Sequence, residues 1–198
     1  MNKYHIIGYL IASGVKIDTI FEITNGKRKS EAIMGLIEKT KISSLPDFEA
    51  LKNVTYDEKT SKLRNIFLLF NIATLVCKNE RQYRFPFYIY KNEKWDIEHI
   101  HATADGTEEA DDNIGNLTLL LAKINRSYQD DSFSDKRREI IKRDSMGWFI
   151  PLCTKNVFLK QYSEKPKQLE KWDKEDKEEY VSTMWKTLEM FWKGDFLK

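Results

Sequence analysis

Residues 95–101 read WDIEHIH, and residues 117–121 read LTLLL. Both runs are short and read as strands, and the second is apolar at every position except Thr118. Between them, residues 105–112 (DGTEEADD) hold five acidic residues and no basic one, which is typical of an exposed loop. This part of the chain therefore predicts two strands joined by an acidic loop.

Helical patterns precede the strands. Residues 60–78 carry apolar side chains around nearly the whole helical circumference, which indicates a helix buried in a core. Shorter helices are expected at 4–14 and 29–39, where apolar residues recur at helical spacing. The aromatic run FPFYIY at 85–90 favours a further strand, followed by a turn at 91–93.

Helical patterns also follow the strands, at 122–128 and 135–144. A charged stretch at 163–179 leads into an expected terminal helix at 180–192, whose large apolar side chains are spaced to face one way. The pattern predicts a mainly helical α+β protein.

The composition excludes several classes of protein. The 198 residues hold 33 basic and 31 acidic side chains, so the chain is not polybasic, although a local basic patch could still bind nucleic acid. Its two cysteines, Cys77 and Cys153, lie far apart, which disfavours a zinc ribbon and favours a reduced cytoplasmic protein. No apolar run reaches membrane length, and the apolar start reads as a packed helix more readily than as a signal peptide.

The candidate chemistry lies at the first strand. Two of the three histidines, His99 and His101, are two residues apart, and Glu98 precedes them. A carboxylate beside imidazoles suits a metal or acid–base site, but such a pair on a strand is also common on ordinary surfaces. The sequence further on adds Asn116 in IGNLTLL, and then Asn125.

Taken in order, the run WDIEHIHA…IGNLTLL…N…SF…K resembles the HNH nuclease signature. More closely, it is similar to the C-terminal HNH domain of GmrSD-type restriction enzymes, and the likeness covers roughly residues 4–162. The resemblance implies a ββα-metal hairpin and helix embedded among packed helices. Together with the helical patterns, this gives an expected helical layer at 1–84, a nuclease core at 85–145 and a helical extension at 146–198, packed as one unit.

The resemblance also implies roles for individual residues. His99 corresponds to the general base that activates water, and Asn116 to the residue that orients the loop bearing this base. Glu98 and Asn125 correspond to the metal ligands, and their oxygen atoms suit a hard cation such as Mg²⁺, with Mn²⁺ as the alternative. Lys136 corresponds to a phosphate contact.

Two questions stay open within this assignment. Neighbouring residues of a regular strand point to opposite faces, so Glu98 and His99 share one site only where the strand bends or ends. Under the same alternation His99 and His101 share a face, so His101 is a rival base or an auxiliary phosphate or metal contact. Many relatives carry a proline where this chain has Ala102, which leaves the role of His101 open.

Basic residues near the motif are candidates for DNA contact. Lys123, Arg126 and Arg137 join Lys136 in this group, although interspersed acids make a solvated face an equal alternative. The acidic loop at 105–112 is expected to be solvated rather than to bind metal.

The function implied by the resemblance is metal-dependent nicking or cleavage of DNA, in defence against phage or modified foreign DNA. The expected partners are DNA and a ParB-like nucleotide-hydrolysing domain or subunit, because no such motif is found in this sequence. The alternatives are an inactive module that binds DNA or a partner, and an RNA-cutting toxin of the same fold.

Overall fold

Helices surround one small sheet in the part of the chain that the structure, a computed structural model, describes. That part comprises residues 2–56, 60–78, 84–101, 111–125, 132–164 and 168–197. The elements in chain order are α1 (Asn2–Ala12), α2 (Ile17–Thr24), α3 (Lys29–Glu38), α4 (Phe48–Lys52), α5 (Thr60–Cys77), α6 (Phe87–Asn92), β1 (Trp95–His99), η1 (Ile114–Asn116), β2 (Leu117–Leu121), α7 (Ala122–Asn125), α8 (Phe133–Ser145), α9 (Leu152–Phe158), α10 (Lys174–Lys193) and η2 (Asp195–Leu197). The predicted mainly helical α+β class is confirmed.

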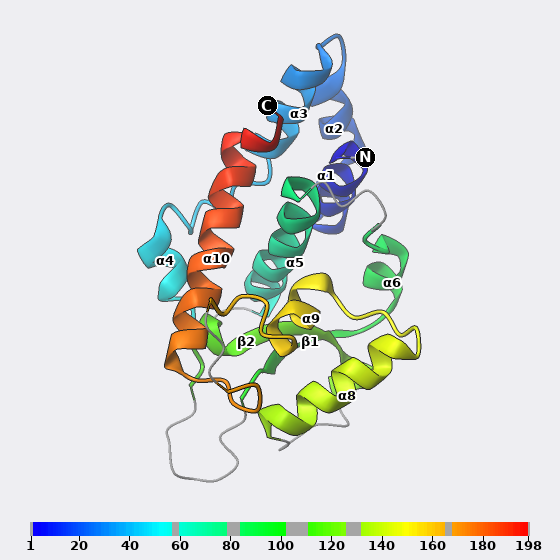
Figure 1. Ribbon diagram of the computed structural model, residues 1–198. Helices are drawn as coiled ribbons and strands as arrows, with labels where there is room; N and C mark the ends of the chain where they lie inside the picture. The colour runs from blue at the N-terminus through cyan, green and yellow to red at the C-terminus, as the bar shows by residue number, and fades with distance from the viewer. Residues whose placement is uncertain are drawn as a thin grey trace.

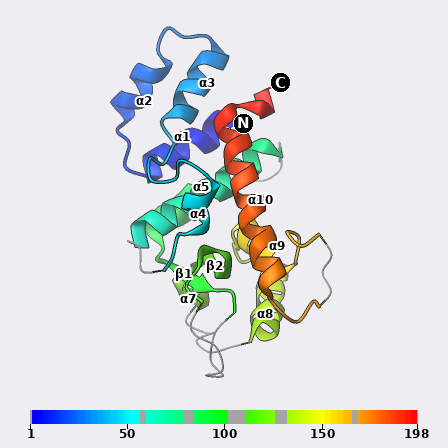
Figure 2. The ribbon, with the colours of Figure 1, turned by 90° about the vertical axis from the view of Figure 1, so that its left-hand side faces the viewer.

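Two long helices connect the ends of the molecule. α5 and α10 pack against each other, with α1, α2 and α3 gathered at one end (Figure 1). The hairpin of β1 and β2 lies at the other end, near α8 and α9, and the view turned by 90° shows α10 running from one end to the other (Figure 2). Through α10, the sheet end of the molecule is joined to its helical end.

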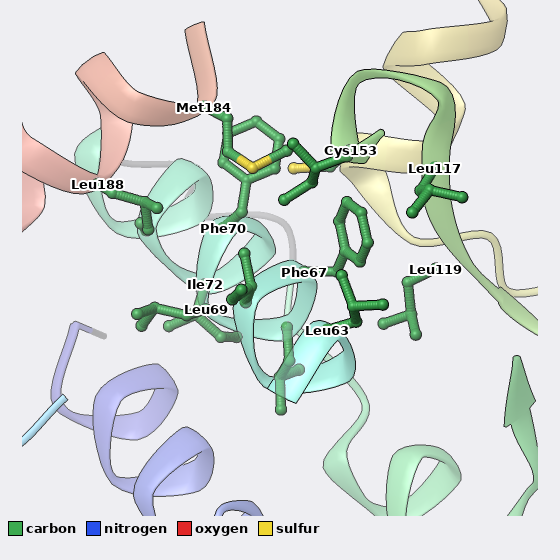
Figure 3. Close-up of a cluster of buried hydrophobic side chains, with 14 of the residues drawn as sticks. Leu63, Phe67, Leu69, Phe70, Ile72, Leu117, Leu119, Cys153, Met184 and Leu188 are labelled. Atoms are coloured by element: carbon green, nitrogen blue, oxygen red, sulfur yellow. The ribbon is translucent and has the colours of Figure 1, made fainter. Parts of the chain in front are cut away.

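The core is built around α5, as the apolar pattern predicts. Phe67 and Phe70 on this helix are 1% and 0% exposed. They lie among side chains from α10, β2 and α9, including Met184 and Leu117 (Figure 3). Burying one such side chain contributes about 1.5–3 kcal/mol, so α5 is the main source of hydrophobic stabilisation.

The sheet is an antiparallel pair in which Trp95 faces Leu121 and His99 faces Leu117. All five residues of β2 are buried because α5 and α9 both pack against this strand. The two predicted strands are therefore confirmed, but β1 ends at His99, two residues earlier than expected. Ile100 then donates its backbone N–H to the carbonyl of Asn116 at 2.7 Å.

The other predicted helices are found with small differences in their ends. The patterns at 4–14, 29–39 and 60–78 correspond to α1, α3 and α5, and the pattern at 135–144 lies within α8. The pattern at 122–128 begins as α7, whereas its last three residues lie outside the described part of the chain.

The strand predicted at 85–90 is wrong, since α6 forms there. Pro86 stands immediately before this helix, and its carbonyl accepts the N–H groups of Ile89 and Tyr90. The aromatic side chains pack into the fold without a sheet, and the ring of Phe85 meets that of Phe149 edge-on at 5.6 Å. β-propensity largely reports how well a side chain packs, so helix packing satisfies the same residues here.

The C-terminal helix is longer than predicted. α10 begins at Lys174, inside the charged stretch that precedes the predicted helix, because Asp173 and Asp176 form a reciprocal N-terminal cap. Three shorter helices, α2, α4 and α9, were not predicted. Their brevity leaves too few turns for a clear apolar period.

The described residues include no helix long and apolar enough to cross a membrane. Cys77 and Cys153 are free thiols, and burial raises the pKa of Cys77 to about 12 and that of Cys153 to about 11. Neither thiol is suited to nucleophilic chemistry near neutral pH.

Candidate functional site

A buried lysine holds the carboxylate of Glu98. Lys136 lies on the inward face of α8, and its ammonium donates to Glu98 Oε1 at 2.5 Å and to the carbonyl of His99 at 2.7 Å. The side chains are 1% and 12% exposed for Lys136 and Glu98. One cation therefore fixes two consecutive residues at the end of β1.

Lys136 points inward because of its place on the helix. Phe133, Lys136 and Ile140 recur at helical spacing and are all buried. Ser132 caps this helix by accepting the N–H of Asp135 at 3.2 Å. The phosphate contact expected of Lys136 is not available in this arrangement, because its ammonium is enclosed and already bound.

His99 is held by an acid from the predicted loop. Its ring Nε2 lies 2.8 Å from Asp112 Oδ1, and its side chain is 30% exposed. The ring of Tyr56 packs against the imidazole with centroids 5.2 Å apart. His99 is thus oriented by two neighbours from different parts of the chain and still reaches solvent.

Asn116 fixes the backbone just after His99. Its amide oxygen accepts the N–H of His101 at 3.0 Å, and its amide nitrogen donates to the carbonyls of His101 and Asp111, both at 3.0 Å. The residue is 1% exposed. The side chain thereby joins His101 to Asp111.

His101 is bound through its backbone rather than its ring. Both hydrogen bonds to Asn116 use the main chain of His101, and its ring Nδ1 is buried with no hydrogen-bond partner among the described residues. Among the described contacts, the imidazole of His99 is therefore held by a hydrogen bond from its ring, whereas that of His101 is not.

The segment that carries Asp112 is anchored on both sides. Tyr56 donates its N–H to the carbonyl of Asp112 at 2.8 Å, and Lys177 on α10 pairs with Asp111 at 2.6 Å. Trp172 adds a hydrogen bond from its indole nitrogen to the carbonyl of Gly115 at 3.1 Å. The elements before α5 and at the start of α10 thus frame the site.

The start of α10 is itself held by a buried ion pair. Lys160 and Ser163 both donate to Asp176, and Lys160 also lies 5.7 Å from the ring centre of Trp172. Burial alone would raise the pKa of Asp176, but these hydrogen bonds outweigh it and lower the pKa overall. This carboxylate stays charged and keeps α10 in place beside Trp172.

The remaining predicted basic residues have other partners or fall outside the description. Lys123 is about half exposed and pairs with Glu93 at 3.0 Å, near the start of β1 and away from His99. Arg137 donates to the carbonyl of Phe158 at 2.9 Å. The side chain of Asn125, all of Arg126 and residues 105–110 of the acidic loop lie outside the described residues.

The donors at this site suit a cation with few protein ligands. Within the described ranges, no three His, Cys, Asp or Glu side chains come together as a metal site. Mg²⁺ commonly keeps several waters and takes one or two carboxylates from the protein. A carboxylate can accept at both oxygens, so the contact of Lys136 with Oε1 of Glu98 is compatible with a cation at the other oxygen.

Sequence reasoning missed three residues of the site, which are Tyr56, Asp112 and Lys177. The acidic run contained Asp112, but only its charge was visible and not its contact with His99. Tyr56 and Lys177 lie 43 residues before and 78 residues after His99, and no local pattern marks either of them.

Comparison with known proteins shows the family of the chain. The sequence pattern of the family described as GmrSD restriction endonucleases, C-terminal domain, matches residues 46–184. The match covers most of the chain, including both strands and the helices that pack on them. No curated relative and no solved structure matches the chain.

Proposed function

The chain belongs to the family of GmrSD restriction endonuclease C-terminal domains, and from this premise we propose that it is an HNH-type, metal-dependent endonuclease that nicks or cleaves DNA. The observation that carries the proposal is the joint anchoring of Glu98 and His99 at the end of β1. Lys136 binds the first at 2.5 Å, and Asp112 binds the second at 2.8 Å. Family membership supports the nuclease activity, whereas the HNH mechanism is our inference from these contacts.

The position of His99 at the end of β1 supports a shared site for Glu98 and His99. His99 is the last residue of the strand, and from Ile100 onward the chain is bound to Asn116 instead of a regular partner strand. A strand that ends here need not keep strict alternation of its side chains. We infer that Glu98 and His99 serve one reaction site.

Glu98 would hold the cation together with the amide oxygen of Asn125. A bound Mg²⁺ or Mn²⁺ would supply charge stabilisation of the phosphate and of the departing 3′ oxygen. Lys136 supports this role by holding the carboxylate in a fixed place. Lys123 and Arg126 remain our candidates for contact with the DNA backbone.

His99 would act as the general base. It takes a proton from a water molecule while the water oxygen bonds to phosphorus. The bond from phosphorus to the 3′ oxygen then breaks, and the leaving oxygen takes up a proton from solvent. Asn116 keeps the backbone after His99 in place during this step, because it binds both the N–H and the carbonyl of His101.

A plasmid assay tests the proposal. Supercoiled DNA is incubated with the purified protein and Mg²⁺, Mn²⁺ or EDTA, beside His99→Ala and His101→Ala. We expect open-circular or linear product with either cation, a loss of roughly 10²- to 10⁴-fold for His99→Ala, and activity retained by His101→Ala.

The other outcomes identify the alternatives. Loss of activity only in His101→Ala would keep the nuclease and move the base. Cleavage of RNA but not DNA would favour an RNA-cutting toxin of the same fold. Binding without cleavage, on plain and on phage-derived modified DNA, would favour an inactive binding module.

We also propose that the activity serves restriction of phage or modified foreign DNA inside the cell, with a ParB-like nucleotide-hydrolysing domain or subunit as partner. Adding that partner with nucleotide to the plasmid assay tests this. A rise in cleavage that depends on nucleotide hydrolysis is expected, and an unchanged rate contradicts the partnership.

A further inference from the structure

The end of the acidic run holds two neighbouring carboxylates with different partners, Asp111 and Asp112. Asp111 faces Lys177 on α10, and Asp112 faces the imidazole of His99. The two acids carry the same charge and lie one residue apart, yet only one touches the base of the proposed reaction. This division suggests a specific task for Asp112.

The contact constrains which nitrogen of His99 carries a proton. A carboxylate only accepts hydrogen bonds, so a neutral imidazole facing it must place its single proton on Nε2. The other nitrogen, Nδ1, then has the lone pair. Hydrogen bonds from histidine to carboxylate fix both tautomer and ring orientation in other settings.

The surroundings make this contact a built arrangement rather than a chance surface pair. The backbone of Asp112 is held by the N–H of Tyr56, whose ring also packs against the imidazole. Asp111 is held by Lys177 at 2.6 Å, and Asn113 next along donates to the carbonyl of Lys52 at 2.7 Å. Contacts to other parts of the chain thus hold three consecutive residues, and they keep the backbone of Asp112 beside His99.

We infer that Asp112 is a positioning residue that fixes His99 in the tautomer with the proton on Nε2 and leaves Nδ1 as the nitrogen that accepts the proton of water. The inference rests on the proposed function and adds to it a residue outside the motif that defined the site. When Nδ1 takes the proton, the Nε2–H bond to Asp112 persists and the carboxylate stabilises the imidazolium.

The first test reads the tautomer directly and needs no nuclease activity. The full chain is labelled with ¹⁵N-histidine, and long-range ¹H–¹⁵N spectra are recorded where the rings are neutral. His5→Gln and His101→Gln variants assign the three histidines. We expect His99 to carry its proton on Nε2, and Asp112→Asn to reduce the tautomer ratio by about tenfold or more.

Asp111→Asn is the matched control, because it removes the same charge one residue away. It should lower stability through loss of the pair with Lys177 and leave the spectrum of His99 unchanged. Asp112→Glu keeps a carboxylate and should restore part of the wild-type ratio. A wild-type proton on Nδ1, or a ratio unaffected by Asp112→Asn, would overturn the inference.

The second test concerns the rate. We expect Asp112→Asn to reduce kcat for plasmid nicking roughly 10- to 100-fold with KM changed less than about twofold, and Asp112→Glu to recover part of the loss. An unchanged kcat in an active enzyme overturns the positioning role. If the wild-type protein cleaves no nucleic acid, the proposed function fails, and the tautomer measurement still decides whether Asp112 orients His99.

Discussion

The ion pair between Glu98 and Lys136 makes a quantitative prediction about stability. Replacing Lys136 with Met keeps most of the apolar stem but leaves the carboxylate of Glu98, 12% exposed, without its cation. Breaking a buried pair in this way costs 3–5 kcal/mol in other proteins. We expect about 3 kcal/mol, at the lower end, because water still reaches part of Glu98.

The partner substitution should cost less. In Glu98→Gln the ammonium of Lys136 still donates to the carbonyl of His99, and an amide oxygen replaces the carboxylate oxygen as its second acceptor. We therefore expect a loss of about 1–2 kcal/mol. In the double variant no charge is left buried, and the total should again be about 1–2 kcal/mol. The coupling energy between the two side chains is then about 3 kcal/mol.

Urea unfolding followed by tryptophan fluorescence measures the stability of the wild-type protein, the two single variants and the double variant. The chain provides a matched surface pair in Glu38 and Lys41, 2.7 Å apart with side chains 67% and 48% exposed. The same substitutions there should give a coupling below about 0.5 kcal/mol. A coupling at Glu98 and Lys136 no larger than that of the surface pair would refute the claim that Lys136 fixes Glu98.

Three further outcomes are expected. Asn116→Ala removes three buried hydrogen bonds and leaves the main chain of His101 unsatisfied, so urea unfolding should show a loss of about 2–4 kcal/mol, and a loss below about 1 kcal/mol would contradict the contacts. Mainly through burial, the pKa of His5 is lowered from 6.5 to about 4, and its Nε2 accepts the N–H of Phe85. Because the native state resists protonation, stability that is present above pH 6.5 is lost as the pH falls toward 4, by up to about 3 kcal/mol. His5→Gln should make the stability less dependent on pH in this range. Gly115→Ala would place a methyl group 3.1 Å from the backbone of α10 and should lower the thermal midpoint, whereas an unchanged midpoint would mean that this helix yields easily.

Periodicity predicted the elements that are long or doubly buried. The helix at 60–78 and the strand at 117–121 were found because their apolar residues are dictated by burial on nearly every side. The run at 85–90 misled because aromatic residues before and after Pro86 suit any well-packed surface. The local sequence pattern therefore indicates whether a side chain is buried more reliably than whether it lies in a helix or in a strand.

The site divides in a similar way. The motif drew attention to Glu98, His99 and Asn116, and the structure has the first two at the end of β1 and the third just before β2. The partners of these residues come from α8 and from the segment beside α10 and could not be read from spacing. The sequence identified Lys136 as a basic residue, but only the fold shows that its ammonium is buried and paired with Glu98.

The residues of the candidate site differ in burial, and we expect their roles to differ accordingly. Lys136 and Asn116 are buried and fix the backbone and the carboxylate of the site. His99 and Asp112 are partly exposed and would meet the substrate side. Substitutions of the inner residues should therefore change stability and activity together, and those of the outer residues mainly activity.

A crystal structure of the protein with Mn²⁺, using the anomalous signal of the metal, tests the central claim most directly. The account predicts one strong peak in direct contact with the carboxylate of Glu98 and the amide oxygen of Asn125, on the side of the chain where the ring of His99 lies, with Lys136 still bound to Glu98. Mn²⁺ bound elsewhere in the crystal with no peak at Glu98, or a peak at Glu98 that Asn125 and His99 do not approach, would contradict it.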